Sequence, residues 1–257
     1  MQDNVVFLLF FAVLGGALPP LIWLWFWIKE DLHPEPKILI SATFMGGMVA
    51  VPIALYLENV LASKFPIIES LSKGGELLLI SLLLIVIIEE GVKYIAAKTV
   101  AFSNKNFDEP VDAAIYLISA ALGFAALENA LFLIDNLADI PLYGIGNIFI
   151  DGTLNGVLIS NNLRFIGANV LHVVASGMLG IFIGLSFYKP AIYKYVFIIA
   201  GFSIAILLHI AFNYFILNFE RAPVVVFSGL WVFAIILIFL FERVKGIHTQ
   251  TFIHNIS

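Results

Sequence analysis

Seven stretches of this chain are apolar over about 20 residues, the length of α-helix that crosses the roughly 30 Å hydrocarbon core of a bilayer. They cover residues 4–28, 38–62, 77–98, 111–134, 164–187, 193–217 and 223–242. A segment in lipid must satisfy its backbone hydrogen bonds internally, so each stretch is predicted to be a helix. The expected fold class is therefore all-α, a polytopic transmembrane helix bundle of about seven spans.

Composition agrees with a membrane protein and excludes several kinds of chemistry. Hydrophobic residues make up 61% of the chain and charged residues only 12%. Because the chain contains no cysteine, a thiolate metal site, a disulfide framework and a cysteine nucleophile are excluded. No charged block indicates a nucleic-acid partner. The first stretch has no Lys or Arg before it and is too long for the apolar part of a signal peptide, so it is expected to be a retained span.

We expect residues 1–257 to form a single membrane-embedded domain, because no connection is long enough for a soluble one. Lys and Arg favour the cytoplasmic side. On the side that follows the odd-numbered stretches there are eight, against four on the other: Lys29, Lys37, Lys98, Lys105, Lys189, Lys194, Arg243 and Lys245, against Lys64, Lys73, Arg164 and Arg221. This bias predicts an N-terminus outside and a C-terminus in the cytoplasm.

Two of the connections are distinctive. Residues 29–37 are charged and contain two prolines, which is typical of a solvated interfacial turn. The longest connection, residues 135–163, mixes glycines with apolar residues. It is interpreted either as a plain surface loop or as a lid that dips into the membrane interface.

Ionisable residues interrupt four of the apolar stretches. An ionised side chain near the middle of a bilayer costs about 2.5–3.5 kcal/mol on insertion scales, whereas a whole protein is stabilised by only about 5–15 kcal/mol. These residues must therefore be paired, neutralised or hydrated, and they are candidates for function. They are Glu89, Glu90, Lys93, Glu128, His172 and His209.

The spacing of these residues indicates which of them meet. Glu89 and Lys93 stand four residues apart and share a helix face, while Glu90 points toward a different span. At a rise of about 1.5 Å per residue, the polar groups of four helices fall about 9–18 Å from the same membrane surface. One polar layer is therefore predicted, which includes Asn129 beside Glu128 and Asn213 four residues after His209.

Two carboxylates and two imidazoles in a water-poor cavity can divide acid and base roles. One glutamate can activate water. The imidazoles and the amide of Asn213 are donors of the kind that stabilise the oxyanion formed when a peptide carbonyl is attacked. The set predicts a hydrolase without a covalent nucleophile.

These motifs resemble the PrsW family of membrane proteases, which belong with the CAAX prenyl endopeptidases and bacteriocin-immunity proteins to one superfamily of glutamate intramembrane proteases. The resemblance covers about residues 29–217, including the acidic turn at 30–36. It rests on Glu89-Glu90-x-x-Lys93, Phe124-x-x-x-Glu128-Asn129, Arg164 with His172, and His209-x-x-x-Asn213. CAAX enzymes typically carry Arg four residues after the second Glu and His in the second motif, so Lys93 and Glu128 favour PrsW.

The resemblance implies roles for these residues. Glu89 would be the base that activates water and Glu90 its partner, while Glu128 and His172 would be further members of the site. His209 and Asn213 would bind the oxyanion, and Lys93 and Asn129 would support the others. No cofactor and no metal is implied. The expected substrate is a membrane-anchored protein of a prokaryotic cell membrane, such as an anti-sigma factor.

Other interpretations stay open at this stage. Histidines with carboxylates can hold the zinc of a zinc-dependent membrane protease, although Lys93 would oppose a cation. Buried Glu and His can relay ions or protons in a transporter, although repeated halves are not visible. Glu58 is interpreted as an interfacial carboxylate near the end of the second span. Arg164 is expected to extend to the headgroups.

Overall fold

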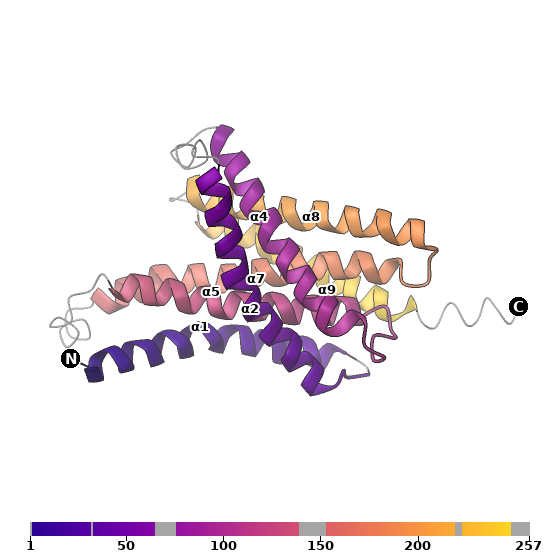
Figure 1. Cartoon of the computed structure of the whole chain (residues 1–257), viewed down its shortest axis with the longest axis horizontal. Helices are drawn as coiled ribbons and strands as arrows, with labels where there is room; N and C mark the ends of the chain where they lie inside the picture. Colours follow the sequence, from indigo (N-terminus) through magenta and orange to yellow (C-terminus); the bar gives the residue numbers. More distant parts are fainter. Residues whose placement is uncertain (1, 32, 65–75, 139–152, 219–222, 248–257) are drawn as a thin grey trace, which may run out of the picture.

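The chain folds into a bundle of long helices (Figure 1). A computed structural model describes residues 2–31, 33–64, 76–138, 153–218 and 223–247, and within these ranges it contains no strand. The elements are α1 (Gln2–Glu30), α2 (Lys37–Lys64), α4 (Glu76–Ala97), the π-helix η1 (Lys98–Phe102), α5 (Asp112–Ala138), α7 (Thr153–Leu185), α8 (Ala191–Asn218) and α9 (Pro223–Lys245). The all-α, polytopic fold class is confirmed.

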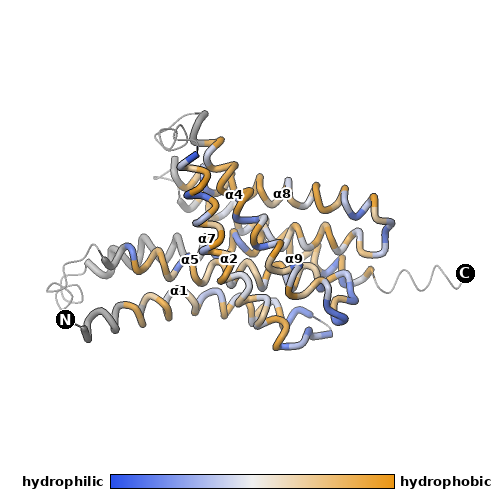
Figure 2. The backbone as a smooth tube through the Cα atoms, in the orientation of Figure 1, coloured by the Kyte–Doolittle hydropathy of each residue, from blue (hydrophilic) through white to orange (hydrophobic). Residues whose placement is uncertain are grey.

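Six of the described helices, all but α4, are long and apolar enough to cross a membrane. Helix α4 is the exception because Glu89, Glu90 and Lys93 interrupt its apolar sequence. Figure 2 shows apolar residues along most of each helix, with hydrophilic residues gathered at the end that holds the α1–α2 and α7–α8 connections. The outer sides of α8 and α9 expose mainly large apolar side chains, as in helices that face lipid. The chain is an integral membrane protein.

Two segments differ from the lengths expected from apolar sequence. Helix α7 begins at Thr153 rather than near residue 164, because residues 153–163 contain no proline and only one glycine to interrupt a helix. The third apolar stretch ends in the π-helix η1 instead of continuing as α-helix. Part of the suggested lid is thus the first turns of α7, and its residues 139–152 lie outside the described ranges.

Helix α5 lies at the centre of the bundle, packed against α1, α2 and α7. Its first half is rich in alanine and almost wholly buried, and such small residues let helix backbones approach closely in membranes. The closest approach is to α2. A Cβ atom on Gly47 would lie 1.9 Å from the carbonyl oxygen of Ala120, and one on Gly123 would lie 1.9 Å from that of Phe44. Only glycine fits at these two positions.

The interpretation of residues 29–37 as a solvated turn is wrong for two of its acids. Asp31 and Glu35 are only 6% and 7% exposed. The turn folds over the start of α5, where the hydroxyl of Tyr116 donates a hydrogen bond to Glu35. The acidic composition of the turn favoured a solvent-exposed position. The contact with Tyr116 joins residues 81 positions apart, so the local sequence gave no sign of it.

Candidate active site

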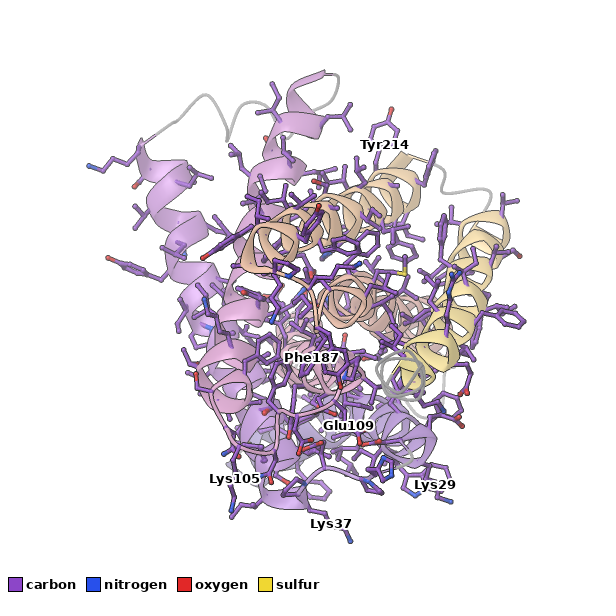
Figure 3. The ribbon with its side chains drawn as sticks, turned by 90° about the vertical axis from the view of Figure 1, so that its right-hand side faces the viewer. Lys29, Lys37, Lys105, Glu109, Phe187 and Tyr214 are labelled. Atoms are coloured by element: carbon purple, nitrogen blue, oxygen red, sulfur yellow. The ribbon has the colours of Figure 1, made fainter. Side chains whose placement is uncertain are left out.

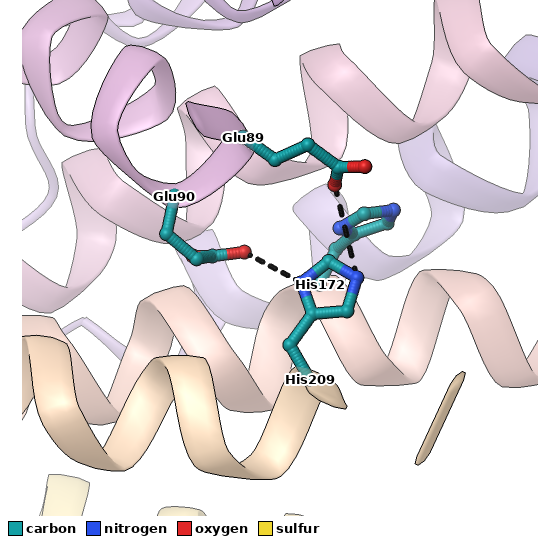
Figure 4. A group of neighbouring side chains, drawn as sticks. All are labelled: Glu89, Glu90, His172 and His209. Atoms are coloured by element: carbon teal, nitrogen blue, oxygen red, sulfur yellow. Dashed lines mark hydrogen bonds and ion pairs between the residues drawn. The ribbon is translucent and has the colours of Figure 1, made fainter. Parts of the chain in front are cut away.

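Helix α4 supplies three ionisable side chains that are buried next to α5, α7 and α8. Glu89 and Glu90 are 8% and 1% exposed, and Lys93 is fully buried. Leu82 and Val86, which precede them on α4, are buried as well, so this part of the helix lies inside the bundle. Figure 4 shows Glu89, Glu90, His172 and His209 converging from α4, α7 and α8.

The ammonium group of Lys93 holds the centre of this cluster. Its Nζ atom lies 2.8 Å from Oε1 of Glu90, 3.3 Å from Oε2 of Glu89 and 2.9 Å from Nδ1 of His172. It also lies 4.3 Å from the centre of the Phe124 ring. An ammonium has three donors and no acceptor, so these contacts use all three. Lys93 therefore pairs with both carboxylates, not only with Glu89 on its own helix face.

The contacts of His172 fix its tautomer. Because the ammonium of Lys93 can only donate, Nδ1 of His172 must accept, and the proton of the neutral ring is on Nε2. That proton is donated to Oε2 of Glu128, at 2.8 Å. Both ring nitrogens are thus engaged, and the ring is buried while the Glu128 side chain is 44% exposed. Glu128 orients His172, and Asn129 donates a hydrogen bond across to Asn169 of α7 at 3.2 Å.

Glu90 is fixed by contacts on every side, whereas Glu89 is not. Oε2 of Glu90 accepts a hydrogen bond from the hydroxyl of Ser176 at 2.9 Å. Oε1 of Glu90 lies 3.0 Å from Nδ1 of His209 and 2.8 Å from Nζ of Lys93. Glu89 makes the longer 3.3 Å contact with Lys93, and its Oε2 lies 3.7 Å from Nε2 of His209. Among the described residues, no hydrogen bond is made to Oε1 of Glu89.

A cavity of about 200 Å³ opens beside these groups. This is room for several water molecules at roughly 30 Å³ each. Polar and apolar side chains share its wall. The polar members are Glu89, Glu128, Asn129, His172, His209 and Asn213, and the apolar ones include Leu82, Phe132, Leu171, Phe212 and Ile216. Six of the eight polar residues singled out from the sequence therefore line one cavity, while Glu90 and Lys93 lie behind its wall.

The structure adds Glu58 to the surroundings of this site. Glu58 is half-buried on α2, and its carboxylate repels those of Glu89 and Glu128. Its position near the end of an apolar stretch indicated an interfacial residue, and only the packing of α2 against α4 and α5 brings it near the cluster. The side chain of Arg164 lies outside the described part of α7.

The four residues that converge in Figure 4 are also the types that bind a transition metal, and their ligand atoms all lie within 4.8 Å of one another. The contacts of Lys93 nevertheless do not fit a resident metal. Its ammonium already bonds to Glu89, Glu90 and Nδ1 of His172, and the other nitrogen of His172 carries a proton. A metal ion would have to displace a buried cation from its partners.

One protein-family model matches most of the chain. Residues 34–241 match the family model described as "PrsW family intramembrane metalloprotease". The chain belongs to the PrsW family. All the residues that line the cavity lie within the matched range.

Curated relatives carry the same family name. The chain is 31% identical over 129 residues to Protease PrsW of Geobacillus kaustophilus, covering 50% of this chain and 54% of the relative. It is 33% identical over 128 residues to that of Clostridioides difficile, covering 49% and 52%. It is 25% identical over 212 residues to that of Shouchella clausii, covering 79% and 83%. The chain spans about half the length of the first two PrsW relatives, and no solved structure matches it.

The central place of Lys93 in this PrsW site leads to a prediction about stability. Replacing Lys93 with Met should lower the free energy of unfolding by about 3–5 kcal/mol, because two buried carboxylates lose their cation. Unfolding of the purified protein in mixed micelles would measure the change. Adding Glu90→Gln to Lys93→Met should restore part of the loss. The exposed Lys98 gives a matched control, Lys98→Met, which should change stability by less than about 1 kcal/mol. Equal effects of the two single changes would contradict the central role of Lys93.

Proposed function

We propose that residues 1–257 form one membrane-embedded peptidase unit, which hydrolyses a peptide bond of a membrane-anchored protein with water activated by Glu89. One observation carries the proposal. Of two adjacent glutamates, Glu90 is fixed by Lys93, Ser176 and His209, whereas Glu89 lines the cavity with one oxygen free of hydrogen bonds from described residues. A general base needs this access to its substrate.

The reaction follows from the groups around the cavity. Glu89 takes a proton from water as the water oxygen bonds to the carbonyl carbon of the substrate. The proton then passes to the departing amine nitrogen as the carbon–nitrogen bond breaks. Lys93 holds Glu89 in place and offsets its charge, and Glu90 in turn fixes the ammonium of Lys93.

The oxyanion formed on the carbonyl oxygen needs donors at the cavity wall. Asn213 offers its amide. His209 lies at the same wall and offers a ring N–H, with its Nε2 3.7 Å from Oε2 of Glu89 and its Nδ1 3.0 Å from Oε1 of Glu90. Glu128 holds His172 in a fixed orientation at the same wall. Asn129 supports this wall through its bond to α7.

The biological setting is proposed from the family. We place the chain in a prokaryotic cell membrane with its N-terminus outside and its C-terminus in the cytoplasm. We place PrsW itself in the superfamily that includes CAAX proteases and bacteriocin-immunity proteins. An anti-sigma factor with a single span is the proposed kind of substrate.

A comparison of membrane-protein fragments tests the proposed activity. Cells that make the wild-type chain should accumulate fragments of a few single-span proteins that are absent when the chain carries Glu89→Gln. An identical fragment set would contradict the proposal. The family description as metalloprotease favours one alternative, which purified protein can test: a chelator should leave cleavage unchanged, whereas loss of cleavage that zinc restores would establish a zinc enzyme.

A further inference from the structure

A second polar cluster lies at the other end of α5 from the candidate active site, at about 24 Å along the helix. The α1–α2 turn and the segment before α5 bring five carboxylates together there. Figure 3 looks onto this end, with Glu109 below the centre and Lys29, Lys37 and Lys105 along the lower rim. The cluster comprises Asp31, Glu35, Asp108, Glu109 and Asp112.

Neutral donors hold the buried members in place. Asp31, Glu35 and Asp112 are 6%, 7% and 1% exposed. Oδ2 of Asp112 accepts the backbone N–H groups of Asp108 and Glu109, at 2.9 and 2.7 Å. Tyr116 donates to Glu35, and the backbone N–H of His33 donates to Oδ1 of Asp31. The side chains are thus oriented toward one another by donors that carry no positive charge.

Counter-charge is scarce around this cluster. In the described ranges, no lysine or arginine forms an ion pair with any of the five carboxylates. Among the residues that the structure describes, the one ion pair to these carboxylates joins His33 to Glu109, at 2.9 Å, and His33 lies at the surface. Burial raises the pKa of Asp31 and of Glu35, because the charged form loses hydration. The fold therefore concentrates negative charge where it is unfavourable.

A separate observation concerns Asp31. Its Oδ2 atom is buried and has no hydrogen-bond partner in the described structure. Its charge acts on that of Glu35, so Asp31 borders the group formed by Glu35, Asp108 and Asp112 without being a member of it. Buried polar atoms nearly always have a partner. A proton on this oxygen would itself need an acceptor, whereas a cation would satisfy it directly.

We propose that this cluster binds a hard divalent cation of the size of Ca²⁺, which ties the α1–α2 turn to the start of α5. Calcium takes carboxylate oxygens at about 2.3–2.6 Å, so its ligands lie within about 5 Å of one another. Oxygens of Glu35, Asp108 and Asp112 all lie within 4.8 Å of one another. The cation would fix the membrane-surface end of the helix that carries Glu128 to the candidate active site.

Cation binding can be measured on the purified full-length protein in detergent, after chelator treatment and exchange into metal-free buffer. Tb³⁺ is a luminescent substitute for Ca²⁺, and excitation of Tyr116, which contacts Glu35, would sensitise it. We expect saturable luminescence that Ca²⁺ displaces, and a rise of several degrees in the thermal midpoint with Ca²⁺. Absence of saturable binding would overturn the proposal.

Matched variants locate the bound ion. Asp31→Asn and Glu35→Gln should each weaken Ca²⁺ binding at least tenfold. Asp108→Asn changes an exposed member, so it gives the same test if the buried variants do not fold. Glu242→Gln, a change of the same charge at the same end of the bundle, should bind as wild type. Glu89→Gln should also bind as wild type, because nitrogen-containing sites do not favour Ca²⁺. Binding unchanged in Asp108→Asn and the other cluster variants would refute the site.

Discussion

Changing Glu89 to Gln should lower cleavage of a co-expressed single-span substrate by about 100- to 10,000-fold, the contribution of a general base. Glutamine keeps the size of the side chain but cannot accept the proton of water. Because Glu90 keeps its bonds to Lys93, Ser176 and His209, the variant should still insert and fold. The measurement is the ratio of cut to uncut substrate in membranes.

Two comparisons make this result specific. Glu242→Gln removes a half-exposed carboxylate paired with Lys245, so it should cleave as wild type. Glu90→Gln should reduce activity and also stability, since it removes charge that Lys93 and His209 contact. Undiminished cleavage by the Glu89→Gln protein would rule out this glutamate as the base.

Substituting valine for Gly123 should prevent stable packing of α2 on α5. The new Cβ atom would lie 1.9 Å from the carbonyl oxygen of Phe44 and 2.7 Å from its carbonyl carbon. Backbone atoms cannot move aside as a flexible side chain can, so the two helices must separate. We expect a loss above the usual range of about 1–3 kcal/mol for overpacking. The thermal midpoint and the fraction of monodisperse protein in detergent would report it.

Gly229 provides the matched control for this substitution. It lies on α9, and a Cβ atom there meets nothing within 4 Å. Gly229→Val should therefore leave the thermal midpoint close to that of wild type. Equal midpoints for Gly123→Val and Gly229→Val would contradict the close crossing of α2 and α5.

The candidate site also bears on how a family described as metalloproteases can act. The ammonium of Lys93 lies where the acceptors of Glu89, Glu90 and His172 converge. It supplies positive charge without occupying the cavity. A fixed ammonium and a metal ion can stabilise the same carboxylates. If a metal ion can take the place of the Lys93 ammonium, the Lys93→Met variant should bind one.

The sequence by itself determined the membrane class, the helical fold and the residues that gather at the site. Apolar length and the need to satisfy backbone bonds in lipid leave few alternatives to a helix. The cost of charge in a membrane makes residues such as Glu89 and His209 stand out without any structure. Spacing along a helix also predicted correctly that Glu89 and Lys93 share a face.

Tertiary structure decided which partner each group has. Contacts between helices pair Glu90 with His209 and Ser176, place Glu89 at the cavity wall and fix the tautomer of His172. They also buried Asp31 and Glu35 in a turn whose composition indicated solvent. The physical reason is that helical periodicity fixes only the face on which a residue lies on its own helix. Partners far apart in sequence depend on how the helices cross. Those crossings depend in turn on close backbone contacts such as those at Gly47 and Gly123.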